Sequence, residues 1–219
     1  MKNKLISSFQ RDDELFNYIA DALYKEGYCV VKNAIPSAMA NALEGYVQEL
    51  TDSQFHTARI GRDQQQISND AIRRDSIYWI NGANDIEQQW LAWCEKLQLH
   101  LNRSLMLGLY SFESQIAKYE IGDFYKRHVD AFKGQKNRVL TLVTYLNRDW
   151  LEQDGGHLVI YQDDNDTVGT HILPELGTLV IFLSEQFPHE VSAANRQRHS
   201  IAGWFRVNNS AANRLDPPQ

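Results

Sequence analysis

Two histidines, an aspartate and an arginine stand out in this sequence because together they could form a metal site beside a carboxylate-binding group. His128 and Asp130 are separated by one residue, and side chains at i and i+2 of a β-strand project from the same face. His189 comes much later, directly after Pro188 at the end of an apolar run. Two histidines and one carboxylate on a β scaffold are typical of the facial triad of non-haem Fe(II) oxygenases, which leaves coordination positions open.

Arg198 adds a second chemical function to this group. It follows His189 by nine residues and stands at the start of another predicted strand. A guanidinium can bind one end of a dicarboxylate in a bidentate way while the other end chelates the metal. Taken alone, the His-x-Asp pair is more often a solvated strand end, and an arginine is more often a surface ion-pair partner. The four residues in this order are more specific, and they predict an iron and 2-oxoglutarate site.

The elements that must position these residues change in kind near Gly108. Before it, apolar residues at helical spacing predict helices at about 15–24, 36–50 and 86–101, with strand-like runs at 28–31 and 76–80. After it, runs rich in β-branched and aromatic residues, separated by turn residues, predict strands at 112–119, 125–129, 138–146, 157–161, 169–173, 178–183 and 199–207. Helices followed by antiparallel strands predict an α+β fold with a sandwich or barrel at its core.

Composition limits the classes of protein to which the chain can belong. Its 219 residues are 43% hydrophobic and 23% charged, which is ordinary for one globular domain. A net charge of −6 makes nucleic acid and anionic membranes unexpected partners. Cys29 and Cys94 are far apart and indicate neither a disulfide framework nor a zinc site. Because no apolar run has the length of a signal peptide or of a membrane span, we expect a cytoplasmic protein.

Six stretches of the chain resemble the Fe(II)/2-oxoglutarate-dependent dioxygenases, and among them the prolyl 4-hydroxylases related to the hypoxia-sensing prolyl hydroxylases. These stretches are IRRDSIYWI at 72–80, YKRHVD at 125–130, YLNRDW at 145–150, GGHL at 155–158, PHEV at 188–191 and RHSIAGW at 198–204. The resemblance implies a double-stranded β-helix (jelly-roll, cupin-like) core with N-terminal supporting helices. It implies a single domain over 1–219, in which 1–108 is mainly helical support with a substrate loop at about 59–72 and 109–207 is the jelly-roll core.

The resemblance also implies roles for individual residues. The implied metal ligands, and hence catalytic residues, are His128, Asp130 and His189. The implied 2-oxoglutarate-binding residues are Arg198 at the C5 carboxylate, Tyr145 beside it, Tyr119 near the other end and Trp204 as an aromatic wall. The implied substrate-binding residues are Arg138 and an ion pair between Arg73 and Asp75 at the base of the substrate loop. Ala202 stands where the animal relatives usually carry threonine, which implies one hydrogen bond fewer to 2-oxoglutarate.

The implied activity is peptidyl-proline 4-hydroxylation, which uses Fe(II), O2 and 2-oxoglutarate, decarboxylates 2-oxoglutarate to succinate, and has ascorbate as its expected reductant. Asp130 favours hydroxylation because family members that halogenate generally lack this carboxylate. The expected partner is a protein or peptide that carries a proline, with a translation factor as one candidate. Two alternatives stay open: a hydroxylase of a small molecule or free amino acid, and a non-catalytic metal-binding, cupin-like sensor. Arg198 and Tyr145 argue against the sensor, since a pure metal site requires neither.

Overall fold

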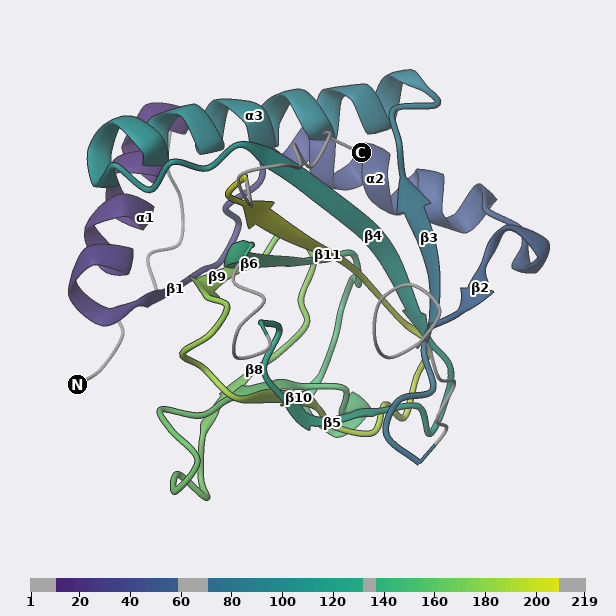
Figure 1. Ribbon diagram of the computed structural model, residues 1–219. Coiled ribbons are helices and arrows are strands. Elements are labelled where there is room, and N and C mark those ends of the chain that lie inside the picture. Colours follow the sequence, from purple (N-terminus) through teal and green to yellow (C-terminus); the bar gives the residue numbers. More distant parts are fainter. Residues whose placement is uncertain (1–10, 59–70, 132–136, 209–219) are drawn as a thin grey trace, which may run out of the picture.

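Three α-helices cover one side of a β-sheet core in this computed structural model, which describes residues 11–58, 71–131 and 137–208 (Figure 1). The helices are α1 (Asp12–Glu26), α2 (Ser37–Glu49) and α3 (Asp85–Leu105). All three helices predicted from the sequence are therefore present. None of the helices within the described ranges is long and apolar enough to cross a membrane.

Local sequence signals set the ends of these helices. Helix α1 ends at Gly27, which adopts φ 76° and donates its N–H to the Leu23 carbonyl; this left-handed conformation favours glycine. Helix α2 begins directly after Pro36. Helix α3 begins at Asp85 and is capped by Asn84, whose side chain accepts hydrogen bonds from the backbone N–H groups of Ile86 and Glu87.

The strands form two antiparallel sheets (Figure 1). The seven-stranded sheet has the order β1 (Tyr28–Val31), β9 (Leu179–Leu183), β6 (Arg138–Tyr145), β11 (Arg198–Arg206), β4 (Ser111–Tyr119), β3 (Ser76–Ile80) and β2 (His56–Thr57). The four-stranded sheet has the order β5 (Tyr125–His128), β10 (His189–Val191), β7 (Leu158–Ile160) and β8 (Thr170–Ile172). Short 3-10 segments at Asp52–Gln54 and Glu152–Asp154 interrupt the described loops. This arrangement confirms the α+β jelly-roll core.

The seven-stranded sheet buries a different set of side chains on each face. Alternating residues of its central strands point toward the helices and join one apolar core, which includes Leu140, Leu142, Ile181, Ile201 and Phe205. The residues between them join a second core against the four-stranded sheet, which includes Val143, Tyr145, Val180, Phe182 and Ile160. The period-2 alternation of strand side chains therefore separates a helix-side face from an inter-sheet face. The candidate site lies on the inter-sheet face.

Candidate metal and cosubstrate site

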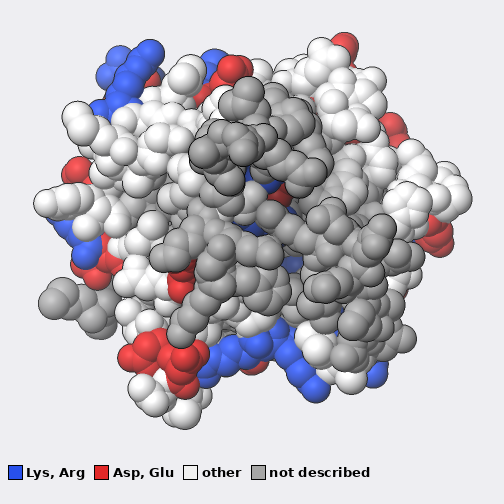
Figure 2. All heavy atoms as spheres, in the orientation of Figure 1, with Lys and Arg blue, Asp and Glu red and all other residues white. Residues whose placement is uncertain are grey.

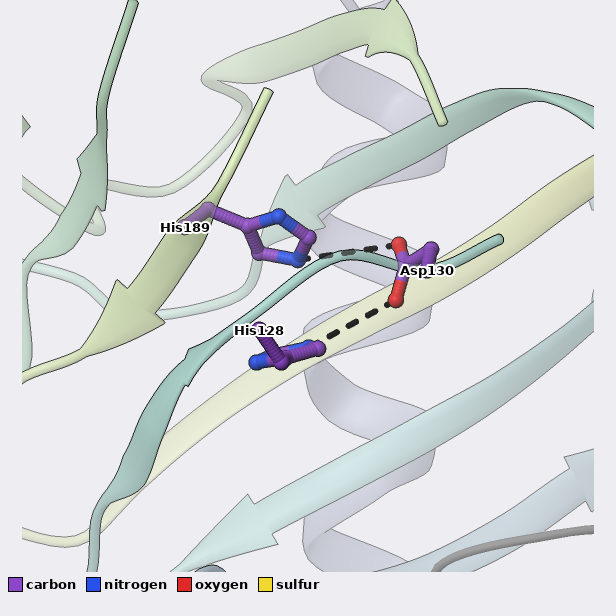
Figure 3. Close-up of side chains that lie close together, drawn as sticks. All are labelled: His128, Asp130 and His189. Carbon is purple, nitrogen blue, oxygen red and sulfur yellow. Dashed lines mark ion pairs between the residues drawn. The ribbon is translucent and has the colours of Figure 1, made fainter. Parts of the chain in front are cut away.

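His128, Asp130 and His189 converge at one point between the two sheets (Figure 3). One ligand atom from each residue lies within 4.8 Å of the other two. Nε2 of His128 is 3.5 Å from Oδ1 of Asp130, and Nε2 of His189 is 3.6 Å from Oδ2 of the same carboxylate. Because the donor set is two imidazoles and one carboxylate, it suits Fe(II) with further coordination positions open.

Both histidines are oriented by the same device. Nδ1 of His128 lies 2.8 Å from the Lys126 carbonyl oxygen, and Nδ1 of His189 lies 3.0 Å from the Phe187 carbonyl oxygen. A carbonyl oxygen can only accept a hydrogen bond, so each Nδ1 carries the proton and each Nε2 keeps a free lone pair. Burial, followed by repulsion from His128, lowers the pKa of His189 to about 4. Its imidazole is therefore neutral and able to bind a metal at physiological pH.

Asp130 is held by side chains of the seven-stranded sheet. Its Oδ2 accepts hydrogen bonds from Thr141 Oγ1 at 2.7 Å and from Trp204 Nε1 at 3.1 Å, and Thr141 Oγ1 is also 2.9 Å from Ser184 Oγ. Burial alone would raise the pKa of Asp130, but His189, His128 and the Thr141 hydrogen bond outweigh it and hold this pKa well below its usual range. The carboxylate is thus ionised, and the two donors on Oδ2 leave Oδ1 available to a metal.

The local backbone differs from the expected strand over 125–129. Strand β5 ends at His128, and Asp130 lies in the bend that follows. The register also shifts along β5: His189 pairs with His128 and Val191 pairs with Tyr125, so three steps on β5 oppose two on β10. This irregularity is a β-bulge, and bulges re-aim side chains next to functional sites. The triad is formed as predicted, but by a bulged strand end rather than by regular alternation.

Arg198 is buried on the inter-sheet face, beside Tyr119 and Tyr145, and has no carboxylate partner among the described residues. Its residue surface is 1% exposed. Its Nε donates to the Gly156 carbonyl at 2.8 Å, and its Nη1 donates to Ser200 Oγ at 3.1 Å. Across 11–58, 71–131 and 137–208, no acidic side chain forms an ion pair with it. A buried cation without a counter-ion is costly unless a ligand supplies the negative charge, so Arg198 is suited to bind a carboxylate.

Two tyrosines enclose this guanidinium. Cζ of Arg198 lies 4.8 Å from the ring centroid of Tyr119 and 5.2 Å from that of Tyr145. Burial raises the pKa of both phenols, and the charge of Arg198 reduces the effect, so both remain protonated donors. The Tyr145 hydroxyl is buried next to the Arg198 guanidinium and makes no hydrogen bond of normal geometry within the described residues. Buried polar atoms are normally paired, so this hydroxyl and Arg198 together fit the carboxylate of a cosubstrate such as 2-oxoglutarate.

Gly156 makes room for the arginine. It adopts φ 63°, and a Cβ added at this position would lie 2.9 Å from Cδ of Arg198 and 3.3 Å from Cβ of Ala194. Its carbonyl meanwhile fixes the Nε of Arg198. A side chain at residue 156 would therefore displace the guanidinium from the position it occupies beside Tyr145.

The remaining predicted site residues lie around Trp204 and Tyr125. Arg138 donates two hydrogen bonds to Oε1 of Glu113, at 3.1 and 2.8 Å, and its Cζ lies 3.8 Å from the ring centroid of Trp204. Trp204 itself donates its indole N–H to Asp130, so it supports the metal ligand. Arg73 and Asp75 form the predicted ion pair, with Nη2 and Oδ2 2.6 Å apart. Residues 59–70 of the expected substrate loop lie outside the described residues.

Several functional side chains were not singled out from the sequence. Thr141, Tyr125, Ser200 and Gly156 each contact a predicted ligand-binding residue, and Ser184 contacts Thr141. The strand pattern could have indicated two of them. Thr141 lies four residues before Tyr145 and Ser200 two residues after Arg198, and residues an even number of positions apart in a regular strand lie on the same face. No comparable signal existed for Tyr125, because the bulge reverses its parity relative to His128.

Surface charge is mixed on the face shown in Figure 2. Acidic atoms gather at its lower edge, over the loop between β7 and β8, with basic atoms directly beside them. Arg127 of β5 donates to the carbonyl oxygens of Asp163 and Asp166 in this loop. Its Cζ lies 3.8 Å from the ring centroid of Tyr161. Arg127 therefore fastens the loop to β5.

Comparison with known proteins gives a consistent picture. The sequence pattern of the 2OG-Fe(II) oxygenase superfamily matches residues 114–206. Human Egl nine homolog 1 is 28% identical over 197 residues, which cover 86% of this chain and 46% of that protein. The chain spans about half the length of the curated relatives it matches.

Solved structures extend the similarity across the chain. A prolyl-4-hydroxylase from Pseudomonas putida has 33% sequence identity and a TM-score of 0.78, and the match covers 89% of this chain and all of that one. A prolyl hydroxylase from Trichoplax adhaerens, solved with a hypoxia inducible factor oxygen degradation domain peptide fragment, has 28% identity and a TM-score of 0.79, covering 90% and 91% of the two chains. This chain belongs to the 2OG-Fe(II) oxygenase superfamily, which uses Fe(II), 2-oxoglutarate and O2.

Proposed function

We propose that this protein is a 2-oxoglutarate-dependent dioxygenase that hydroxylates prolyl residues of a protein or peptide. The observation that carries the proposal is the buried Arg198, which has no acidic partner among the described residues and lies beside the unpaired Tyr145 hydroxyl. A metal-binding sensor would need neither group. The similarity to two prolyl hydroxylase structures supports a prolyl substrate.

In this proposal each residue of the site has one task. His128, Asp130 and His189 hold Fe(II), and Arg198 with Tyr145 holds the distal carboxylate of 2-oxoglutarate, with Tyr119 close to its other end. When bound, the iron and 2-oxoglutarate supply the oxidising chemistry that places one oxygen atom of O2 on a substrate carbon and yields succinate and carbon dioxide. The two sheets exclude water around this centre, and Thr141 and Trp204 keep Asp130 in place. Ascorbate is the expected reductant.

The substrate side is proposed from the residues that border Trp204 and Tyr125. Arg138 is paired with Glu113 and stacked on Trp204, so we assign it to the wall of the peptide site rather than to a free charge that captures an acidic peptide. Arg73 and Asp75 are likewise paired with each other. The target can be a peptide like the one bound by the Trichoplax homologue or a segment of a translation factor.

The test combines binding and turnover. Calorimetry with the Mn(II)-loaded chain is expected to show 2-oxoglutarate binding that disappears in Arg198→Met. Incubation with Fe(II), ascorbate, 2-oxoglutarate and a prolyl peptide is expected to release succinate and to add the mass of one oxygen atom to a proline, with His128→Ala as the inactive control. Metal binding without 2-oxoglutarate binding would instead indicate the cupin-like sensor. Hydroxylation of free L-proline but of no peptide would indicate the small-molecule hydroxylase.

A further inference from the structure

The ring of His128 is stacked on the ring of Tyr125. Their centroids are 3.6 Å apart and their planes differ by 17°. Residues three apart in a regular strand would point to opposite faces, but the bulge in β5 brings these two rings to the same side. The Nδ1 hydrogen bond fixes one edge of the imidazole, and the stack fixes its plane.

Arg73 lies against the same tyrosine. Its Cζ is 4.4 Å from the Tyr125 ring centroid, and since the His128 imidazole covers one face of this ring, the guanidinium uses the other. A cation over an aromatic face is attracted by the negative charge of the π system. Tyr125 is therefore held between the metal ligand and a cation.

The guanidinium is itself held in place. Nε and Nη2 of Arg73 donate to Oδ1 and Oδ2 of Asp75 at 2.8 and 2.6 Å, a bidentate pairing, and the Asp75 side chain is fully buried. Burial would lower the pKa of Arg73, but the hydrogen bond and charge of Asp75 more than offset this and raise it above its ordinary value. The cation over Tyr125 is thus permanent and its direction is set.

The backbone around Arg73 is also attached to the metal-binding strand. Arg73 and Tyr125 form an isolated antiparallel bridge. The N–H of Lys126 donates to the Ile72 carbonyl at 2.9 Å, and the N–H of Arg74 donates to the Phe124 carbonyl at 3.2 Å. The segment that carries the ion pair and the strand that carries His128 therefore keep a fixed spacing.

We propose that Arg73 and Tyr125 are positioning residues for the metal ligand His128, so that metal affinity in the absence of any peptide depends on both. This inference rests on the proposed iron site. It assigns to Arg73 a role distinct from contact with the substrate. Groups that orient a metal-ligating histidine typically change metal affinity 10- to 100-fold when they are removed.

The test is a titration of the full apo chain with Mn(II), without 2-oxoglutarate or peptide. Tyr125→Leu removes the stack and is expected to weaken Mn(II) binding roughly tenfold, whereas Tyr125→Phe keeps the ring and is expected to bind like the wild type. Arg73→Gln is expected to weaken binding in the same direction, with partial rescue in Arg73→Lys. Because Arg73→Gln leaves Asp75 buried without its partner, the Tyr125 pair carries the comparison if that variant does not fold.

The matched control is Arg127→Gln. Arg127 also belongs to β5 and its guanidinium also lies over a tyrosine ring, that of Tyr161, but within the described part of the chain no side-chain contact joins this pair to His128, Asp130 or His189. The visible absorption of the Co(II)-loaded protein reports ligand geometry, and it is expected to change in Tyr125→Leu but not in Arg127→Gln.

The outcomes separate this inference from the proposed function. Wild-type Mn(II) affinity in folded Tyr125→Leu, or an equal loss in Arg127→Gln, would overturn the positioning role alone. A wild-type chain that binds no Mn(II) would overturn the iron site and this inference together.

Discussion

The two faces of the seven-stranded sheet are made by alternate residues of the same strands, but they differ in how their buried polar groups are paired. On the helix-side face, the large polar side chains next to the sheet have partners within the protein: Trp90 donates to Ser114, and Glu87 accepts from Tyr46 and Tyr78, while His100 Nε2 of α3 is a buried atom without one. On the inter-sheet face, the Tyr145 hydroxyl is unpaired and Arg198 has no acidic partner in the described chain. The helix-side face is therefore organised for stability and the inter-sheet face for a ligand.

The strongest test of this contrast is Arg198→Met. Removing one partner of a buried charge pair costs about 2–5 kcal/mol, so 2-oxoglutarate affinity is expected to fall roughly 30-fold or more. Thermal stability without ligand is expected to stay the same or rise, because an uncompensated buried charge is removed. Calorimetry and thermal unfolding measure the two effects. Arg196→Met, which changes an exposed arginine two residues away, is the control for ligand binding and should leave 2-oxoglutarate affinity unchanged. A large fall in the Arg198→Met unfolding midpoint would contradict the contrast.

The opposite behaviour is expected on the helix-side face. Leu97 is fully buried in α3, and Leu97→Ala should lower the free energy of unfolding by about 2–5 kcal/mol by leaving a cavity. At temperatures where the variant stays folded, its Mn(II) stoichiometry and 2-oxoglutarate affinity should match the wild type. Chemical denaturation gives the first quantity and calorimetry the second. Leu99→Ala, on the exposed side of the same helix, should cost far less. Altered ligand affinity in folded Leu97→Ala would show that the two faces are not separable.

On the helix-side face, His199 is expected to make the free energy of unfolding fall as the pH is lowered. Burial, followed by the charge of Lys118, lowers the pKa of His199 to about 4. An unfolded histidine titrates near pH ~6.5, so between about pH 6.5 and 4 the unfolded chain takes up a proton that the folded chain does not, and stability falls as the pH drops through this window. The loss amounts to at most about 3 kcal/mol and is absent above about pH 6.5.

The measurement is the free energy of unfolding of the wild type and of His199→Gln at several pH values. The variant is expected to lose less stability between pH ~6.5 and ~4 than the wild type. His171→Gln, at an exposed position, should keep the wild-type slope. Parallel slopes for the wild type and His199→Gln would exclude His199 as the source.

A smaller effect is expected at Thr141, which connects the inter-sheet face to Asp130. Thr141→Val keeps the shape but removes the donor to Oδ2, and we expect Mn(II) affinity to fall about 10-fold or somewhat more. Thr141→Ser should restore most of the affinity. Thr144→Val is the matched control, because Thr144 is also buried in β6 but donates to the Thr178 carbonyl on the helix-side face. Equal metal affinity in Thr141→Val and the wild type would remove Thr141 from the site.

The smallest effect concerns Ser200. It accepts a hydrogen bond from Arg198 Nη1, so its own proton is free to donate to a carboxylate held there. Ser200→Ala should weaken 2-oxoglutarate binding by about tenfold, close to the ~1.4 kcal/mol of one hydrogen bond to a charged group. Adding a hydroxyl two residues along, in Ser200→Ala/Ala202→Thr, should recover part of the loss in calorimetry. Unchanged 2-oxoglutarate affinity in Ser200→Ala would mean that Ser200 does not replace the hydrogen bond that a threonine at residue 202 would supply.

Much of this protein follows from its sequence alone. Apolar, β-branched and aromatic runs located the strands at 28–31 and 76–80 and seven of the strands after Gly108 to within a few positions, but did not predict β2 (His56–Thr57) or β10 (His189–Val191), which carries a metal ligand. The His-x-Asp, His and Arg order indicated a metal site with a carboxylate-binding group, because so few chemistries need those four side chains together. These features depend on neighbouring residues or on residue type, so a single sequence is enough to predict them.

Other features were decided only by tertiary structure. Regular alternation would place Tyr125 and His128 on opposite faces and Arg138 on the face away from Thr141, but register shifts in β5 and β6 bring each pair into one site. A bulge depends on how two strands pair, and the paired residues here are about 60 positions apart, so no local pattern records it. The sequence determined which side chains could bind iron and a carboxylate. The pairing of the strands decided which others hold them in place.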